Sequence, residues 1–94
     1  MINENDLRVL KVFKCLSNST RFEIIRLLIN SSYSVGKLSE LLKKEIPNIS
    51  QHLKIMRDLN IVSYRTIKNE VMYSLKNESV VRIIEVAEDI LSRH

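Results

Sequence analysis

Hydrophobic side chains recur every three or four positions through most of the first sixty residues. This spacing places them on one side of an α-helix, because successive helical residues are rotated by about 100°. The predicted helices cover residues 6–16, 20–30, 35–44 and 45–60. Asp6 is expected to start the first helix, and Thr20 with Glu23 has the spacing of a capping box for the second. Residues 30–34 form a predicted polar turn, in which Ser34 caps the third helix.

The hydrophobic period changes after Asn60. β-Branched and aromatic residues dominate 61–67 and 71–75 and partly alternate with polar ones, which is typical of β-strands. Residues 68–70 separate the two runs, and Asn69 is the residue best able to adopt a positive φ there. The pattern therefore predicts a β-hairpin.

A last helix is predicted from Asn77 or Ser79 to about Ser92. The whole order is ααααββα, a mainly α fold with a small β-hairpin. This is the order of a winged helix-turn-helix, in which the third and fourth helices form the helix-turn-helix and the hairpin forms the wing. Ninety-four residues, 45% of them hydrophobic, suffice for one core, so 1–94 is expected to be a single domain.

The first and last predicted helices carry more apolar side chains than one small core can cover. A helix covered on one side needs about three apolar positions in seven, and both helices exceed this. We therefore expect a homodimer built from these two helices. The residues expected at its interface are Leu7, Leu10, Phe13, Val80, Ile83, Ile84, Ala87, Ile90 and Leu91.

The predicted fourth helix has one apolar side and a polar tip. Ile49 and Leu53 share the apolar side, whereas the small hydrogen-bonding residues Asn48, Ser50 and Gln51 crowd the first turns. Amide and hydroxyl groups supply donors and acceptors at once, as base edges in the DNA major groove require. The tip is therefore a candidate element for reading DNA.

Composition narrows the class of function. Residues 37–76 contain eight Lys or Arg against four Asp or Glu, which suits a polyanion, although an ordinary solvated surface explains the same excess. The single cysteine excludes an intramolecular disulfide, no apolar run approaches the ~18 residues that span a bilayer, and the first six residues lack the features of a signal peptide. A cytoplasmic protein that does not engage a membrane is expected.

Two histidines, one cysteine and no Gly-rich phosphate loop offer no catalytic set, so an enzyme is not expected.

Four segments, in this order and spacing, resemble the ArsR/SmtB family of dimeric bacterial and archaeal transcriptional repressors. They are KCLSNSTRFEIIRLL, SVGKLSELL, PNISQHLKIMRDLNIVSYR and VMYSL, within about residues 10–76. The most specific piece is ISQHLKIMRDLNIV, which runs directly into the predicted strand. The resemblance implies a dimer that binds an operator in double-stranded DNA, expected to be palindromic, and that is often released by a metal ion or another inducer.

The candidate DNA-binding residues are Asn48, Ser50, Gln51, His52, Lys54 and Arg57 on the recognition helix, and Arg65 and Lys68 on the wing. Asn48 and Gln51 are the best candidates for reading bases, whereas the others are expected nearer the DNA backbone. For His52 the alternative is a structural, hydrogen-bonded imidazole. For Lys54 and Arg57 the alternative is a solvated helix face.

Two places depart from the family pattern. The family usually has an apolar residue and then Ser or Thr before the proline, where this chain has Lys44 and Glu45. The wing tip is Lys68-Asn69-Glu70, where the family tends to have Gly and Arg. We expect the wing to contribute less affinity as a result.

The family's usual metal sites are not expected here. Residues 33–36 lack the cysteines of one site, and the last helix lacks the Asp-X-His pair of another. That helix offers only Glu78, Glu85, Glu88, Asp89 and a terminal His94, which a solvated acidic face explains, so no metal or cofactor is expected. Cys15 is expected to be a buried structural thiol, with a redox role as the alternative. The inducer stays open.

Two other functions fit the same pattern. A winged-helix module could bind another protein through the fourth helix, and a regulator could respond to a metal or oxidant through a non-standard site. A non-specific architectural DNA-binding protein is a further possibility within the DNA-binding class.

Overall fold

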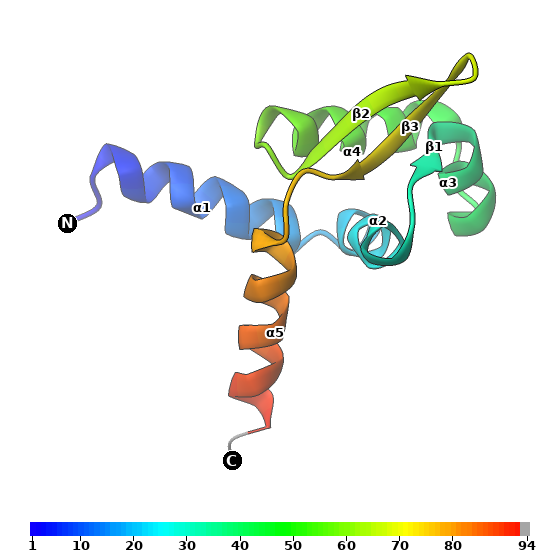
Figure 1. Cartoon of the computed structure of the whole chain (residues 1–94). Helices are drawn as coiled ribbons and strands as arrows, with labels where there is room; N and C mark the ends of the chain where they lie inside the picture. Colours follow the sequence, from blue (N-terminus) through cyan, green and yellow to red (C-terminus); the bar gives the residue numbers. More distant parts are fainter. Residues whose placement is uncertain (93–94) are drawn as a thin grey trace.

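The computed structural model describes residues 1–92 (Figure 1). The helices are α1 (Glu4–Leu16), α2 (Ser19–Asn30), α3 (Val35–Leu42), α4 (Ile46–Asp58) and α5 (Ser79–Leu91). The strands are β1 (Tyr33–Ser34), β2 (Val62–Ile67) and β3 (Glu70–Leu75). This confirms the predicted winged helix-turn-helix, with α3 and α4 as the helix-turn-helix and β2 and β3 as the wing, and it adds one strand.

The additional strand β1 replaces part of the predicted polar turn. Tyr33 pairs with Tyr73 and Ser34 with Met72, so the antiparallel sheet has the order β1-β3-β2. Two residues are too short for a recognisable period, and their strand conformation comes from pairing with β3. The pairing fixes the start of α3 against the wing.

Helix α1 begins earlier than predicted. Asn3 is its N-cap, and the Asn3 side chain accepts a hydrogen bond from the Asp6 N–H at 2.8 Å. The Asp6 carboxylate accepts one from the Asn3 N–H at 3.1 Å. This reciprocal capping box satisfies two N–H groups at the free end of the helix.

The starts of α2 and α3 test two further predictions. Asn18 caps α2, since its side chain accepts from the Arg21 N–H at 3.1 Å. The predicted capping box of Thr20 and Glu23 is therefore wrong, because Thr20 already lies inside the helix. The prediction for Ser34 is confirmed, since it is the N-cap of α3.

The core lies between α2, α3, α4 and the sheet, and it is closed by the nearest ends of α1 and α5. Its buried hydrophobic residues are Cys15, Ile24, Ile25, Leu28, Leu38, Ile49, Leu53, Met56, Ile61, Val62, Val80 and Ile84. Val80 and Ile84 were predicted at the dimer interface. They lie inside the protomer core instead, because they occupy the side of α5 that faces its body.

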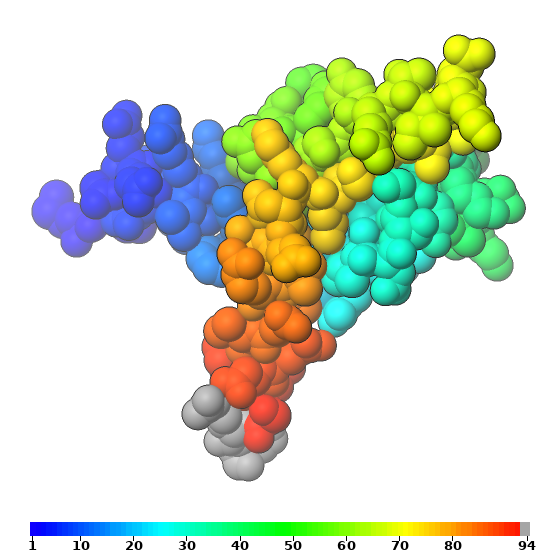
Figure 2. Space-filling model, in the orientation of Figure 1, coloured from blue at the N-terminus to red at the C-terminus, as the bar shows by residue number. Residues whose placement is uncertain are grey.

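Helices α1 and α5 project away from this body in different directions (Figures 1 and 2). Leu7, Leu10 and Phe13 on α1 are about half exposed, and Ile90 and Leu91 on α5 are 67% and 70% exposed. An open apolar groove runs between the two helices where they leave the body. None of the described helices is long and apolar enough to cross a membrane.

The wing turns tightly at its tip. Lys68 and Asn69 have φ values of 51° and 65°, so both central residues of the two-residue turn are left-handed. Two positive φ values match the type I′ turn that suits the twist of a hairpin. The prediction for Asn69 is confirmed, whereas Glu70 is the first residue of β3 rather than part of the turn.

Candidate nucleic-acid interface

The connection between α3 and α4 fixes how the recognition helix leaves the body. Lys43 ends α3 in the left-handed conformation with φ 55°, and the N–H groups of Lys43 and Lys44 both donate to the Ser39 carbonyl. The Ser39 hydroxyl donates to the Lys44 carbonyl. Three hydrogen bonds to one residue make this turn a rigid corner.

Helix α4 starts without a side-chain cap. Pro47 lies in its first turn, as predicted, and the N-cap residue is Glu45, whose carboxylate forms no capping hydrogen bond. The Glu45 carbonyl instead accepts from the N–H groups of Asn48 and Ile49 at 3.0 and 3.1 Å. The departure from the family pattern therefore leaves the Glu45 side chain exposed at the tip of the helix.

The two sides of α4 differ sharply in exposure. Ile49 and Met56 are 0% exposed and anchor the helix in the core. Asn48, Ser50 and Gln51 are all exposed on the first turns. The structure thus brings the three small polar residues together on an accessible tip, and their contact with DNA bases stays a prediction.

His52 is half-buried because it packs against the start of α2. The Arg21 Nη1 lies 3.2 Å from His52 Nδ1, and since arginine only donates, Nδ1 must accept. Burial lowers the pKa of His52 below 6.5, and the nearby charges of Arg21 and Lys44 lower it further. The lowered pKa favours the neutral imidazole, and a hydrogen bond from Arg21 to Nδ1 favours the tautomer with its proton on Nε2. The hydrogen bond that the structural alternative for His52 requires is present, whereas the contact of His52 with DNA stays a prediction.

The two basic residues further along α4 are both engaged within the protomer. Lys54 pairs with Asp58 one turn later at 3.1 Å. The Arg57 guanidinium lies 5.3 Å from the centre of the Tyr64 ring on β2, and Tyr64 in turn lies 5.6 Å from the Tyr73 ring. Such an exposed ion pair contributes little stability, so Lys54 can exchange its partner for a phosphate at small cost.

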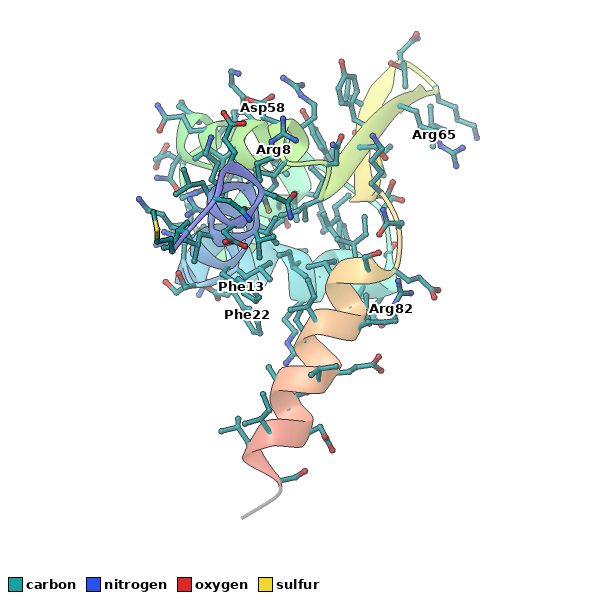
Figure 3. All side chains as sticks on the ribbon, turned by 90° about the vertical axis from the view of Figure 1, so that its left-hand side faces the viewer. Arg8, Phe13, Phe22, Asp58, Arg65 and Arg82 are labelled. Carbon is teal, nitrogen blue, oxygen red and sulfur yellow. The ribbon has the colours of Figure 1, made fainter. Side chains whose placement is uncertain are left out.

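The wing is joined to the end of α4. The helix ends at Asp58, two residues before the predicted end, because Asn60 adopts a left-handed φ of 63°. The Lys76 ammonium donates to the Asn60 side chain at 3.0 Å, and the Lys76 N–H donates to the Ile61 carbonyl at 2.9 Å. This joint holds the wing beside α4, and Figure 3 shows Arg65 projecting outward from it. Arg65 and Lys68 are exposed, as their predicted role requires.

Arg21 contacts a candidate interface residue, His52, and sequence reasoning missed this contact. Arg21 directly follows the polar cluster of residues 17–20, inside the predicted second helix, where no functional role was expected for it. Its guanidinium also donates from Nε to the Cys15 carbonyl at 3.0 Å. The motif that contains it was visible, but its partners are six and thirty-one residues away, so only the fold identifies its contacts.

The surroundings of Cys15 and of the acidic residues of α5 indicate structural roles. Cys15 is 2% exposed, and burial raises the pKa of its thiol more than the neighbouring Arg21 lowers it. A protonated, buried thiol is a poor nucleophile. Glu88 pairs with Arg26 at 3.3 Å. Within residues 1–92, no group of three or more His, Cys, Asp or Glu side chains could hold a metal, and His94 lies outside the described residues.

Known proteins that resemble this chain in sequence are regulatory proteins, which agrees with a nucleic-acid interface on α4. The family described as "bacterial regulatory protein, arsR family" matches residues 18–64. The cadmium resistance transcriptional regulatory protein CadC homolog of Staphylococcus aureus is 32% identical over 88 residues, which are 93% of this chain and 73% of the relative.

Solved structures extend the likeness to nearly the whole chain. HlyU from Vibrio cholerae, which is named a transcriptional activator, superimposes with a TM-score of 0.80 at 28% identity over 95% of this chain and 97% of that one. The homodimeric winged helix-turn-helix DNA-binding domain of Mb0332 from Mycobacterium bovis has a TM-score of 0.80 at 24% identity, covering 93% and 84%. At that identity the second likeness shows the fold alone.

Proposed function

The chain belongs to the bacterial arsR family of regulatory proteins, and we propose that it is a dimeric repressor that recognises a palindromic operator. The family consists of transcriptional regulators that bind double-stranded DNA, and the chain is such a regulator rather than an enzyme. The observation that carries the proposal is the division of α4 into a buried side and an exposed polar tip. A helix fixed by its core side can present its tip to the major groove in one orientation.

We assign base reading to Asn48 and Gln51 and backbone contacts to the remaining candidate residues. Ser50 and His52 flank the tip, and Lys54 and Arg57 follow along the same helix, so all could lie near one stretch of groove. Arg65 and Lys68 extend the basic surface onto the wing. Glu70 offsets the charge of Lys68 at the wing tip, which supports a smaller contribution from the wing than from α4.

A dimer would complete this interface and cover the projecting helices. The exposed apolar side chains of α1 and α5 line an open groove, and the fold is shared with a neighbour described as homodimeric. We assign the dimer contacts to Leu7, Leu10, Phe13, Ile83, Ala87, Ile90 and Leu91. A twofold dimer presents two recognition helices, which is why a palindrome is the expected operator.

The proposed setting is the cytoplasm, with 1–94 acting as one DNA-binding domain. The ordinary cysteine site of the family's metal sensors has no counterpart in residues 33–36. The proposed regulator therefore either needs no metal or uses a non-standard site. Operator binding measured with and without a panel of metal ions and oxidants distinguishes these two cases.

Fluorescence anisotropy with the DNA upstream of the protein's own gene tests the proposal. We expect this duplex to compete far better than a random duplex of equal length, and we expect affinity to fall steeply between about 50 and 200 mM salt. A protein-interaction module would bind neither duplex. A reporter gene behind the same DNA then tests repression against activation.

Gln51→Ala tests the assignment of base reading. We expect this variant to lose about 1–3 kcal/mol on the preferred operator and to discriminate less between sequences, whereas Arg65→Ala weakens all sequences alike. Competition binding against single-base operator variants measures both effects. Unchanged discrimination in Gln51→Ala would show that this side chain does not face the bases.

A further inference from the structure

Arg21 and His52 meet beside α4, and Lys44 lies in the corner that leads into this helix, close enough for its charge to act on His52. The ion pairs within residues 1–92 join Arg26 to Glu88, Lys37 to Glu40 and Lys54 to Asp58, so neither Arg21 nor Lys44 has a carboxylate partner there. Like charges gathered without a counter-ion repel, and an anion placed among them relieves that repulsion.

The geometry of Arg21 is fixed before any ligand arrives. Its N–H is held by the cap residue Asn18, its Nε by the Cys15 carbonyl, and its Nη1 by His52. These contacts come from α1, from the N-cap of α2 and from α4. A guanidinium has five N–H donors, and the bonds to Cys15 and His52 use two, so further donors remain for an acceptor.

Lys44 and His52 are also pre-positioned. The backbone of Lys44 is held at both ends by Ser39. The His52 ring is oriented by Arg21, which leaves Nε2–H as a donor. Within residues 1–92 no buried side-chain nitrogen lacks a partner, and no hydrogen bond of Nε2 occurs among these residues, so Nε2 is accessible to solvent.

We propose that Arg21, Lys44 and His52 form a binding site for one phosphate of the DNA backbone. The inference rests on the proposed function, since its ligand is the operator itself. Two charged donors and one neutral donor match the several acceptor oxygens of a phosphodiester. The site also links the α1–α2 corner to the recognition helix, so Arg21 both binds the phosphate and positions His52.

Salt dependence separates phosphate binding from a purely structural role. The slope of log affinity against log salt falls by about 0.9 for each phosphate that the protein no longer neutralises. We expect Arg21→Gln and Lys44→Asn each to lower the slope by up to this amount per protomer, and to weaken operator and random duplex about equally, by roughly tenfold. Lys43→Asn is the matched control. It removes the same charge one residue earlier, and asparagine tolerates the left-handed conformation of that position.

The double variant tests whether both cations bind the same phosphate. Arg21→Gln combined with Lys44→Asn should lower the slope by no more than about 0.9 per protomer if the phosphate is shared, and by about 1.8 if two phosphates are contacted. A slope that changes by the larger amount would overturn the shared site. Urea unfolding of each variant measures any loss of folded protein. Such a loss lowers the apparent affinity but does not change the slope of log affinity against log salt for the protein that stays folded.

His52 supplies a readout that needs no DNA. In the wild type its NMR titration should fall below pH 6.5 with the proton on Nε2, and Arg21→Gln should move the titration upward. His52→Gln keeps an acceptor for Arg21 and a donor for phosphate, so it should retain most of the affinity that His52→Leu loses. Equal losses in the two variants would show that His52 only fills space.

The outcomes also distinguish the two proposals. If the wild type binds no duplex, the proposed function fails. If it binds its operator but Arg21→Gln and Lys44→Asn leave the slope unchanged, or Lys43→Asn lowers it equally, only the phosphate site fails. Saturation of the His52 NMR shift by millimolar inorganic phosphate without DNA would assign the site to a small anion instead.

Discussion

The body of the molecule and its two projecting helices use apolar residues in opposite ways. Ile24, Ile25 and Leu38 in the body are 0% exposed, whereas Ile90 and Leu91 near the end of α5 are 67% and 70% exposed. In α1 the buried residue is Cys15, and in α5 the buried residues are Val80 and Ile84. Cys15 and Val80 stand at the helix ends that touch the body, and Ile84 lies one turn further along α5 than Val80.

The difference separates two structural tasks. The body completes its own core and thereby fixes α4, so the orientation of the polar tip depends on contacts within one chain. The projecting helices keep most of their apolar surface uncovered, so burying it requires another molecule. Substitutions in the two regions should therefore affect different measurements, namely unfolding in one and association in the other.

The largest expected effect is on association. Ile90→Glu should raise the dimer dissociation constant by at least about 100-fold, because burying an unpaired carboxylate costs several kcal/mol. The protomer should stay folded, since this position is exposed in it. Sedimentation equilibrium and circular dichroism measure the two properties. Glu85→Gln, which changes the charge of the same helix by one unit in the opposite direction, is the control for a general charge effect, and a dimeric Ile90→Glu variant would remove α5 from the interface.

A matched pair on α4 tests the body. Leu53→Ala should cost about 2–5 kcal/mol of unfolding free energy, because it leaves a cavity in the core. Ile55→Ala on the exposed side should cost far less, within roughly 0.5 kcal/mol of zero. Urea unfolding at a fixed protomer concentration measures both. Similar losses would mean that both sides of α4 are covered.

The pH dependence of stability tests the environment of His52. Because the pKa of His52 is lowered in the folded chain, the unfolded chain takes up this proton first as pH falls. The stability that His52 contributes is therefore complete above pH 6.5 and decreases below it. The difference between the unfolding free energies of the wild type and His52→Gln should become smaller as the pH is lowered from 8 to 5. A constant difference between them would contradict the lowered pKa.

The smallest expected effect concerns the ion pair of Lys54. Asp58→Asn removes its partner and one negative charge near the DNA, so affinity should rise by about two- to fivefold, in line with the small value of exposed pairs. The gain should shrink as salt increases. Glu40→Gln, which frees Lys37 in the same way on α3, serves as the comparison. Equal gains would indicate a general charge effect.

Periodicity predicted those parts of the fold that depend on neighbours along the chain. It identified the buried side of α4, the cap at Ser34 and the left-handed Asn69, each of which follows from local geometry. It missed β1, since two residues acquire their conformation from β3. It also could not distinguish Val80 and Ile84 from Ile83 and Ile90, because α5 is apolar on more than one side and only packing shows which side is covered.

In the candidate site, too, local features were predictable from the sequence and tertiary contacts were not. The exposed tip of α4 was predictable from residue types and helical spacing. The contacts of Arg21 were not, because they join residues from three helices. Tertiary contacts of a single charged side chain leave no period in the sequence.

The capping box of Asn3 and Asp6 has a consequence for gene regulation. Because the free end of α1 is capped, the helix is already formed before the protomers associate. Dimerisation therefore costs little free energy for ordering the chain. Association is then governed mainly by protomer concentration. Below the dimer dissociation constant the concentration of dimer grows with the square of the protomer concentration, so a twofold change in synthesis becomes a nearly fourfold change in operator-competent regulator. This square law follows from dimerisation itself, and the contribution of the cap is to lower the free-energy cost of forming the proposed dimer.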